Sequence, residues 1–167
     1  EKLSNSQKTL SFQHTFPNIL TDKKSSLRLN MVANSAQQSR IAVKVNDTDL
    51  ALVRINPVIS SYNVAEQKDT TMLFTNASNN QLNVEFEYTN PKNASVAYLN
   101  YYELNIQRAL TMTGNAMSFR NIDNVNKYYT AFGKYQLANA LSGVEVWNVT
   151  NHDSIYQVPT SKEGDFL

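Results

Sequence analysis

The chain has 167 residues, of which 41% are hydrophobic and 17% charged, a balance that suits one folded domain with an apolar core and argues against disorder. Its 15 basic and 14 acidic residues are interspersed and leave a net charge of +1, so nothing indicates a nucleic-acid or anionic-membrane partner. The chain has no cysteine, which excludes a thiol nucleophile, a disulfide framework and a Cys-ligated metal within it. No apolar run approaches the roughly 20 residues of a membrane-spanning helix, so we expect no membrane insertion.

Short stretches in which apolar and polar residues alternate, typical of half-buried β-strands, occupy the first half of the chain. Residues 1–9 are polar, and we expect them to be frayed. A hairpin is predicted around the turn residues 46–48, and residues 65–69 are expected to form a polar loop. The alternation predicts strands over residues 10–16, 27–31, 41–45, 50–55, 58–64, 71–75 and 82–88.

Residues 98–120 form the longest apolar-rich passage, and we expect the fold to be organised around it. Tyr98, Tyr102 and Leu104 share one parity and Glu103 lies on the other, which is a period near two. A helical period also fits part of the passage, but its Tyr, Asn and Ile residues favour a strand. Residues 114–115 predict a turn, after which residues 116–120 would return as a partner strand. Further strands are predicted over residues 128–132, 135–141, 144–150 and 155–158.

About ten short strands at this spacing predict an all-β protein, a two-sheet β-sandwich of the jelly-roll (galactose-binding-like) type. We expect residues 1–159 to form this single domain and residues 160–167 to be a linker toward a further C-terminal domain. The 22 asparagines, against only 4 glycines, are expected to supply the positive φ angles of the turns. Trp147, the only tryptophan, is expected to be buried in the core.

Candidates for catalysis or metal binding are sparse. His14 lies on the apolar parity of its strand and is interpreted as structural, whereas His152 has Asp153 beside it but no evident nucleophile. Asp47 and Asp49 lack the Gly and distal Glu of an EF-hand loop and are interpreted as turn residues, with a single structural Ca²⁺ left open. We therefore predict no catalytic residue, no cofactor and no metal ligand in this chain.

Carboxylates and aromatic residues leave two further alternatives open. Glu85, Glu87 and Glu103 fall on the polar parities of strands, so a solvated face is expected. A glycosidase pair stays open because such carboxylates meet in space rather than in sequence. Aromatic residues on strands are mostly core residues, but some here could stack on sugar rings or form an interface. The candidate ligand or interface residues are Tyr101, Tyr102, Tyr128 and Tyr129.

Two passages carry a resemblance to a known family. They are YLNYYELNIQRAL…GNAMSFR at residues 98–120 and VEVWNVT at residues 144–150, preceded by the hairpin VKVNDTDL. In this order they resemble the non-catalytic β-rich region that precedes the peptidase domain in PorU-like sortases of the type IX secretion system, gingipain-type cysteine peptidase relatives of the Bacteroidetes. The chain differs at Asn100 and Asn148, where the family usually has Asp. It keeps Leu99, Tyr101, Glu103, Arg108, Leu110, Phe119, Arg120, Val146, Trp147, Val149 and Thr150.

The resemblance implies a non-catalytic accessory module that packs on, or positions, a downstream cysteine peptidase domain of the same polypeptide. It also implies export to the periplasm or outer-membrane surface of a Gram-negative bacterium, with secretion-system proteins or glycans as further partners. The apolar pair Phe166-Leu167 is expected to begin the next domain, with an interdomain contact near this end. The alternative from another class is a carbohydrate-binding module of galactose-binding-like fold, and an enzyme in its own right ranks third.

Overall fold

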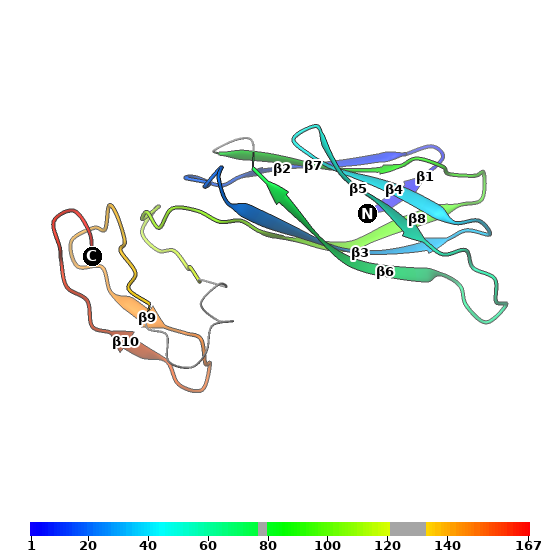
Figure 1. The fold of residues 1–167 in the computed structure, drawn as a ribbon. Helices are drawn as coiled ribbons and strands as arrows, with labels where there is room; N and C mark the ends of the chain where they lie inside the picture. The colour runs from blue at the N-terminus through cyan, green and yellow to red at the C-terminus, as the bar shows by residue number, and fades with distance from the viewer. Residues whose placement is uncertain (77–79, 121–132) are drawn as a thin grey trace. The chain divides into compact units, whose positions relative to one another are not determined.

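The computed structural model describes residues 1–76, 80–120 and 133–167 (Figure 1). The described residues form strands, turns and loops, and no helix among them could cross a membrane. Two compact units divide the chain, Glu1–Arg108 and Ala109–Leu167, and each is described by itself. All strands of the sandwich lie in the first unit. That residues 1–159 form a single domain and residues 160–167 a linker stays a prediction from the sequence.

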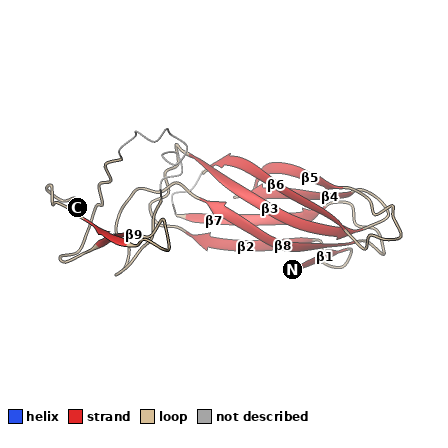
Figure 2. Ribbon diagram, turned by 90° about the horizontal axis from the view of Figure 1, so that it is seen from below, coloured by secondary structure: helices blue, strands red, loops and turns tan. Residues whose placement is uncertain are grey.

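The first unit is a β-sandwich of two antiparallel four-stranded sheets, which confirms the predicted fold class. The strand order is β1-β8-β3-β6 in one sheet and β2-β7-β4-β5 in the other (Figure 2). Only β4 and β5 are consecutive strands within one sheet; every other connection crosses between the sheets, as in a jelly roll. The strands are β1 (Lys2–Ser4), β2 (Thr9–Thr15), β3 (Lys24–Asn34), β4 (Ser39–Val45), β5 (Thr48–Ile55), β6 (Glu66–Thr75), β7 (Gln81–Tyr88) and β8 (Val96–Asn105).

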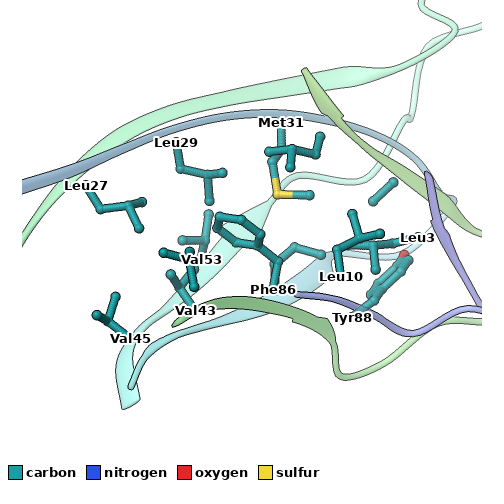
Figure 3. Packing of buried hydrophobic residues seen from close by; sticks show 14 of the residues in the cluster. Leu3, Leu10, Leu27, Leu29, Met31, Val43, Val45, Val53, Phe86 and Tyr88 are labelled. Carbon is teal, nitrogen blue, oxygen red and sulfur yellow. The ribbon is translucent and has the colours of Figure 1, made fainter. Parts of the chain in front are cut away.

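The apolar residues of these strands alternate with polar ones, so each sheet buries one face against the other. Figure 3 shows the resulting core, in which Leu29 and Met31 of β3 lie across from Val43 and Phe86 of the second sheet. The hydroxyl group of Tyr88 is also buried, and it shares a 2.7 Å hydrogen bond with the Ser39 hydroxyl. Each of these two buried hydroxyl groups therefore has the other as its hydrogen-bond partner within the core.

Asparagine takes the place of glycine in several turns, as predicted. The β4–β5 hairpin turns through Asn46 and Asp47, whose φ angles are 49° and 62°, as in the two-residue turns that match the twist of a hairpin. Asn18 and Asn139 also have positive φ angles. The hairpin prediction is confirmed.

Three sequence predictions in the first unit are wrong. Residues 2–4 are not frayed but form β1, whose Leu3 is completely buried. Residues 58–64 form a loop instead of a strand. The supposed polar loop at residues 65–69 is mostly strand, because β6 starts at Glu66 and pairs with β3 along its whole length. Both β1 and β6 are edge strands, where pairing with a neighbour outweighs weak local alternation.

The central strand β8 contains a bulge that the sequence pattern concealed. Met31 of β3 pairs with Leu99. Asn30, the residue before Met31, pairs with Tyr101 and not with Asn100, so Asn100 is an extra residue in β8. One inserted residue reverses the alternation. Tyr98 and Tyr102 were expected on one face, but Tyr98 faces outward whereas Tyr102 packs against the core.

The second unit contains a two-stranded hairpin of β9 (Val146–Asn148) and β10 (Tyr156–Val158). Leu137 and Leu167 exchange two backbone hydrogen bonds of 3.0 and 3.1 Å. The strands predicted at residues 116–120 and 135–141 do not form, apart from a bridge at Ala138, and the strand predicted at 128–132 lies outside the described residues. Trp147 is 51% exposed, so its predicted burial is wrong: a two-stranded ribbon has no second layer to cover it.

Candidate functional site

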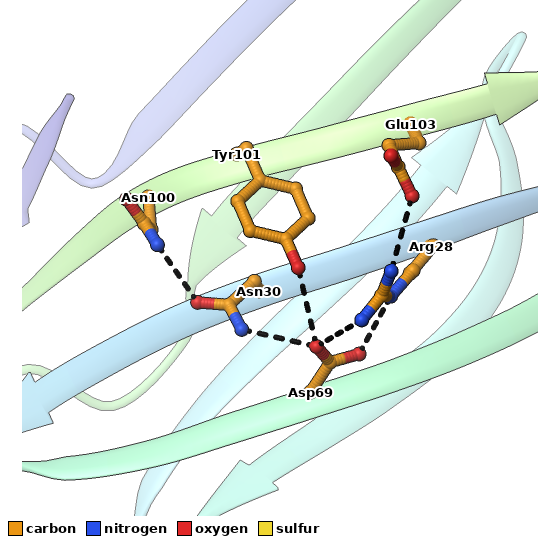
Figure 4. A network of polar contacts seen from close by, with 6 residues as sticks. All are labelled: Arg28, Asn30, Asp69, Asn100, Tyr101 and Glu103. Carbon is orange, nitrogen blue, oxygen red and sulfur yellow. Dashed lines mark hydrogen bonds and ion pairs between the residues drawn. The ribbon is translucent and has the colours of Figure 1, made fainter. Parts of the chain in front are cut away.

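Six polar side chains form a connected group on the outer face of strands β6, β3 and β8 (Figure 4). Because Leu27, Leu29 and Met31 point into the core, the alternation of β3 directs Arg28 and Asn30 outward. The register then sets side chains of β6 and β8 beside them. The members of this outer polar network are Arg28, Asn30, Asp69, Asn100, Tyr101 and Glu103.

Arg28 is the charged residue at the centre of the network. Its Nε and Nη2 donate to the two carboxylate oxygens of Asp69 at 3.1 and 2.9 Å, a bidentate pair, and Nη1 donates to Glu103 at 3.4 Å. The guanidinium also lies 5.6 Å from the centre of the Tyr101 ring, within the range of a cation–π contact. One arginine thus ties together side chains of three strands.

The Asp69 carboxylate is held in its ionised form. Its pKa is lowered to about 2, first by the hydrogen bond from Arg28 and next by that from Asn30. The Arg28 pKa is raised in return, chiefly by the hydrogen bond to Asp69. A group so acidic cannot act as a general acid near neutral pH.

Amide and hydroxyl groups complete the network. Asn30 donates to Asp69 at 3.1 Å and accepts from Asn100 at 3.2 Å, and the Tyr101 hydroxyl donates to Asp69 at 3.3 Å. Asn30 is only 3% exposed although it lies on the outer face, because the neighbouring side chains cover it. The bulge in β8 places both Asn100 and Tyr101 on this face, so the local irregularity builds part of the network.

The carboxylates considered for a glycosidase pair lie on the outer faces of two different sheets, and each is paired with a basic side chain. Glu103 belongs to the outer polar network, whereas Glu85 and Glu87 pair with Lys44 at 3.4 and 3.8 Å on the outer face of the other sheet. Two packed sheets are about 10 Å apart even before side chains are counted. Asp69 and Glu103 are both engaged by Arg28. This geometry suits a fixed recognition surface better than proton transfer.

The predicted tyrosines separate onto two faces. Tyr101 is 36% exposed on the outer face. Tyr102 turns inward, where its ring packs 5.2 Å from Phe12 and 5.4 Å from Phe86, and burial raises its hydroxyl pKa. These two tyrosines therefore cannot stack on one ligand together. Tyr128 and Tyr129 lie outside the described residues.

The histidines occupy unrelated positions. His14 shares a hydrogen bond with the hydroxyl of Tyr102 and stacks on Phe16 at 5.9 Å, which is the arrangement of a structural histidine. His152 lies 3.1 Å from Asp153, and both are highly exposed. Within residues 1–76, 80–120 and 133–167, no three His, Asp or Glu side chains gather as a metal site would require. Arg28 and Asp69 were not singled out from the sequence, since only the β3–β6 register brings them together.

The strand order and the two-layer core define the first unit as a jelly-roll β-sandwich. No family model matches the sequence, and no curated protein matches it. Among solved structures, dimeric latent PorU from Porphyromonas gingivalis aligns with 95% of this chain at a TM-score of 0.79 and 15% identity. The match spans only 15% of the PorU chain. At this identity the likeness shows a shared fold.

A carbohydrate-binding module, CBM36 in complex with calcium and xylotriose, aligns with 62% of this chain and 77% of its own at 10% identity. The TM-score is 0.42, so the similarity is too distant for any inference about ligands.

Proposed function

We propose that this chain is a non-catalytic accessory module of a gingipain-like type IX secretion sortase, packing on or positioning a peptidase domain of the same polypeptide. The observation that carries the proposal is the alignment of 95% of the chain with 15% of the much longer PorU chain. The resemblance in sequence also supports the proposal, and its two passages include most of β8 and all of β9. The proposal includes export to the periplasm or outer surface of a Gram-negative bacterium.

The outer polar network is the surface we assign to the contact with the peptidase domain. Interfaces between domains of one chain bury about 600–1,500 Å² and are more polar than a core. A surface whose side chains already hold each other in place loses little conformational entropy on docking. Arg28 with Asp69 and Glu103 supplies such fixed charge, and Tyr101 supplies an exposed aromatic edge.

The test compares the module alone with the complete natural polypeptide. Glu103→Lys places a positive charge beside Arg28 on the assigned surface, and Glu87→Lys is the matched control on the opposite sheet. We expect the module to melt at a higher temperature within the complete protein than alone, and Glu103→Lys to lose more of this gain than Glu87→Lys. If the parts melt at the same temperatures joined or separate, the module is only tethered and the proposal fails.

Carbohydrate binding is the second candidate function. The observation that favours it is the position of Tyr101 among amide and carboxylate groups on one exposed sheet face, since sugars bind to aromatic rings flanked by planar polar groups. Glycan-array binding that is lost in Tyr101→Ala and kept in Tyr98→Ala would support this function over the accessory role. Tyr98 is a suitable control because it is exposed on the same strand.

A further inference from the structure

The loop between β5 and β6, residues 56–65, carries large apolar side chains into solvent. Ile59, Tyr62 and Val64 are 90%, 94% and 82% exposed, more than any other large apolar residue that the structure describes. No residue of the loop is charged. Apolar residues scattered singly over a surface need no explanation, but three within one short loop indicate a contact. We call these three side chains the apolar tip.

Basic residues collect at the end of the first unit from which this loop projects (Figure 1). Three other connections lie at the same end, because β4 starts beside the end of β5 and backbone hydrogen bonds join Val58 to Ser35 and Lys8 to Tyr88. The only charged residues in the four connections, residues 5–8, 35–38, 56–65 and 89–95, are two lysines. With two arginines of the adjoining strands they form a basic rim of exposed residues, Lys8, Arg40, Arg54 and Lys92.

The two arginines of the rim lie directly opposite each other on β4 and β5. The N–H of Arg40 donates to the Asn90 side chain at 2.8 Å, and its C=O accepts from the Thr89 N–H at 3.0 Å. Its pair with Arg54 is therefore of the non-hydrogen-bonded kind, in which side chains approach more closely. Like charges in this position repel, and no carboxylate among the described residues forms an ion pair with either guanidinium. An anionic surface would relieve this repulsion.

We propose that this end of the first unit binds the surface of an anionic phospholipid bilayer as a peripheral contact. The apolar tip enters the boundary between headgroups and acyl chains, where aliphatic side chains and amphipathic tyrosines are stable. The basic rim faces the lipid phosphates, and each Lys or Arg near such a surface strengthens binding roughly fivefold. An uncharged tip with basic residues behind it is complementary to both layers of the surface. This inference is independent of the proposed function.

A bilayer suits the apolar tip better than a groove on an acidic protein does. The tip belongs to a loop without strand pairing, so its side chains lack the regular spacing that a groove would match, whereas a lipid boundary is fluid and needs no complementary shape. The interspersed charges of the sequence predicted no anionic-membrane partner. The fold alters that expectation, because it gathers basic residues from four separate parts of the chain at one end.

The first test is cosedimentation of the whole chain with lipid vesicles of phosphatidylcholine, either alone or with about a third of phosphatidylglycerol. We expect binding to the anionic vesicles to be at least about a hundredfold tighter and to weaken as salt is added. Ile59→Ser combined with Val64→Ser should weaken binding at least about tenfold. Leu73→Ser is the matched control, since Leu73 is an exposed apolar residue on the outer face of β6, and it should leave binding unchanged.

A second pair of variants tests the basic rim. Arg40→Gln combined with Arg54→Gln should weaken binding to the anionic vesicles by about 30-fold. Lys23→Gln combined with Lys24→Gln removes the same charge at the opposite end of the sandwich, where β3 starts, and should change binding by less than about twofold. All substituted side chains are exposed, so each variant should keep the fold, which circular dichroism checks.

Fluorescence locates the contact on the molecule. Tyr62→Trp, made together with Trp147→Phe, places the only tryptophan on the apolar tip. On anionic vesicles its emission should shift to the blue and be quenched by lipids brominated on their acyl chains, whereas Leu73→Trp in the same background should show neither effect.

Three results would overturn the proposal: no binding to anionic vesicles, equal binding to neutral and anionic vesicles, or equal binding by the tip variants and their controls. Binding of poly-glutamate that depends on the apolar tip, without binding to vesicles, would assign this end to an acidic protein and would equally overturn it.

Discussion

Replacing Leu3 by alanine tests whether the first residues of the chain belong to the core. Leu3 is completely buried, and Figure 3 shows it near Leu10 and Tyr88. The substitution removes three side-chain carbons, which at about 0.8 kcal/mol each amount to roughly 2.4 kcal/mol of lost burial. The cavity left behind adds to this, since Leu→Ala changes in cores cost about 2–5 kcal/mol. We therefore expect the free energy of unfolding to fall by about 3 kcal/mol.

Urea unfolding followed by far-UV circular dichroism measures this loss. With a slope of about 1–3 kcal/mol per molar urea, the midpoint should fall by about 1–3 M while the slope stays the same. Lys2→Ala, at an exposed position of the same strand, is the control and should change stability by no more than about 0.5 kcal/mol. Equal midpoints for the two variants would show that Leu3 does not belong to the core and that residues 1–9 are frayed, as their composition suggested.

Three further predictions concern the outer polar network, the second unit and the hairpin turn. The Asp69 pKa is lowered from 3.8 to about 2, so its ionised form stabilises the fold above pH 3.8 and this contribution is lost as the pH falls toward 2. Across this range the urea midpoint should drop more for the wild type than for Asp69→Asn. An equal drop in the two midpoints would contradict this prediction. Trp147 is half exposed, so its fluorescence emission should be red-shifted and quenched freely by acrylamide. Trp147→Ala should lower the free energy of unfolding by less than about 1 kcal/mol. Blue-shifted emission that acrylamide does not quench would contradict the exposed position. Asp47 has a φ of 62°, so Asp47→Val should lower the free energy of unfolding by about 1–2 kcal/mol, whereas Asp47→Gly should be nearly neutral. Equal urea midpoints for these two variants would show that the positive φ of the turn does not limit the residue at this position.

Local alternation was sufficient to predict the strands whose two faces differ in solvent exposure. In β7, apolar and polar residues alternate without a break, and the predicted strand coincides with the observed one to within a residue. The strand β1 could not be found this way, because it is three residues long and contains only one apolar residue. Its stability comes from pairing with β8, a contact between residues that are more than 90 positions apart in the chain.

The outer polar network was beyond sequence analysis for a related reason. Asp69 lies in a run of polar residues that resembles a loop, and its partner Arg28 is 41 residues away. Only the long pairing of β6 with β3 brings the two side chains within hydrogen-bonding distance. A charged residue on a predicted strand indicates an outward face, but the identity of its partner depends on register, which no local pattern encodes. Tyr101 could be named from the sequence, whereas the network around it could not.

The bulge at Asn100 accounts for two features of β8 at once. Without the extra residue, Tyr98 and Tyr102 would lie on one face, and Tyr101 would point into the core together with Leu99. With it, Asn100 and Tyr101 are neighbours on the outer face, where they bond to Asn30 and Asp69. Tyr102 and Leu104 are directed inward, beyond the reach of β1. The polar surface assigned to an adjoining domain and the inward packing of Tyr102 and Leu104 therefore depend on the same inserted residue, because a bulge reverses which face of the sheet every following residue of the strand points to.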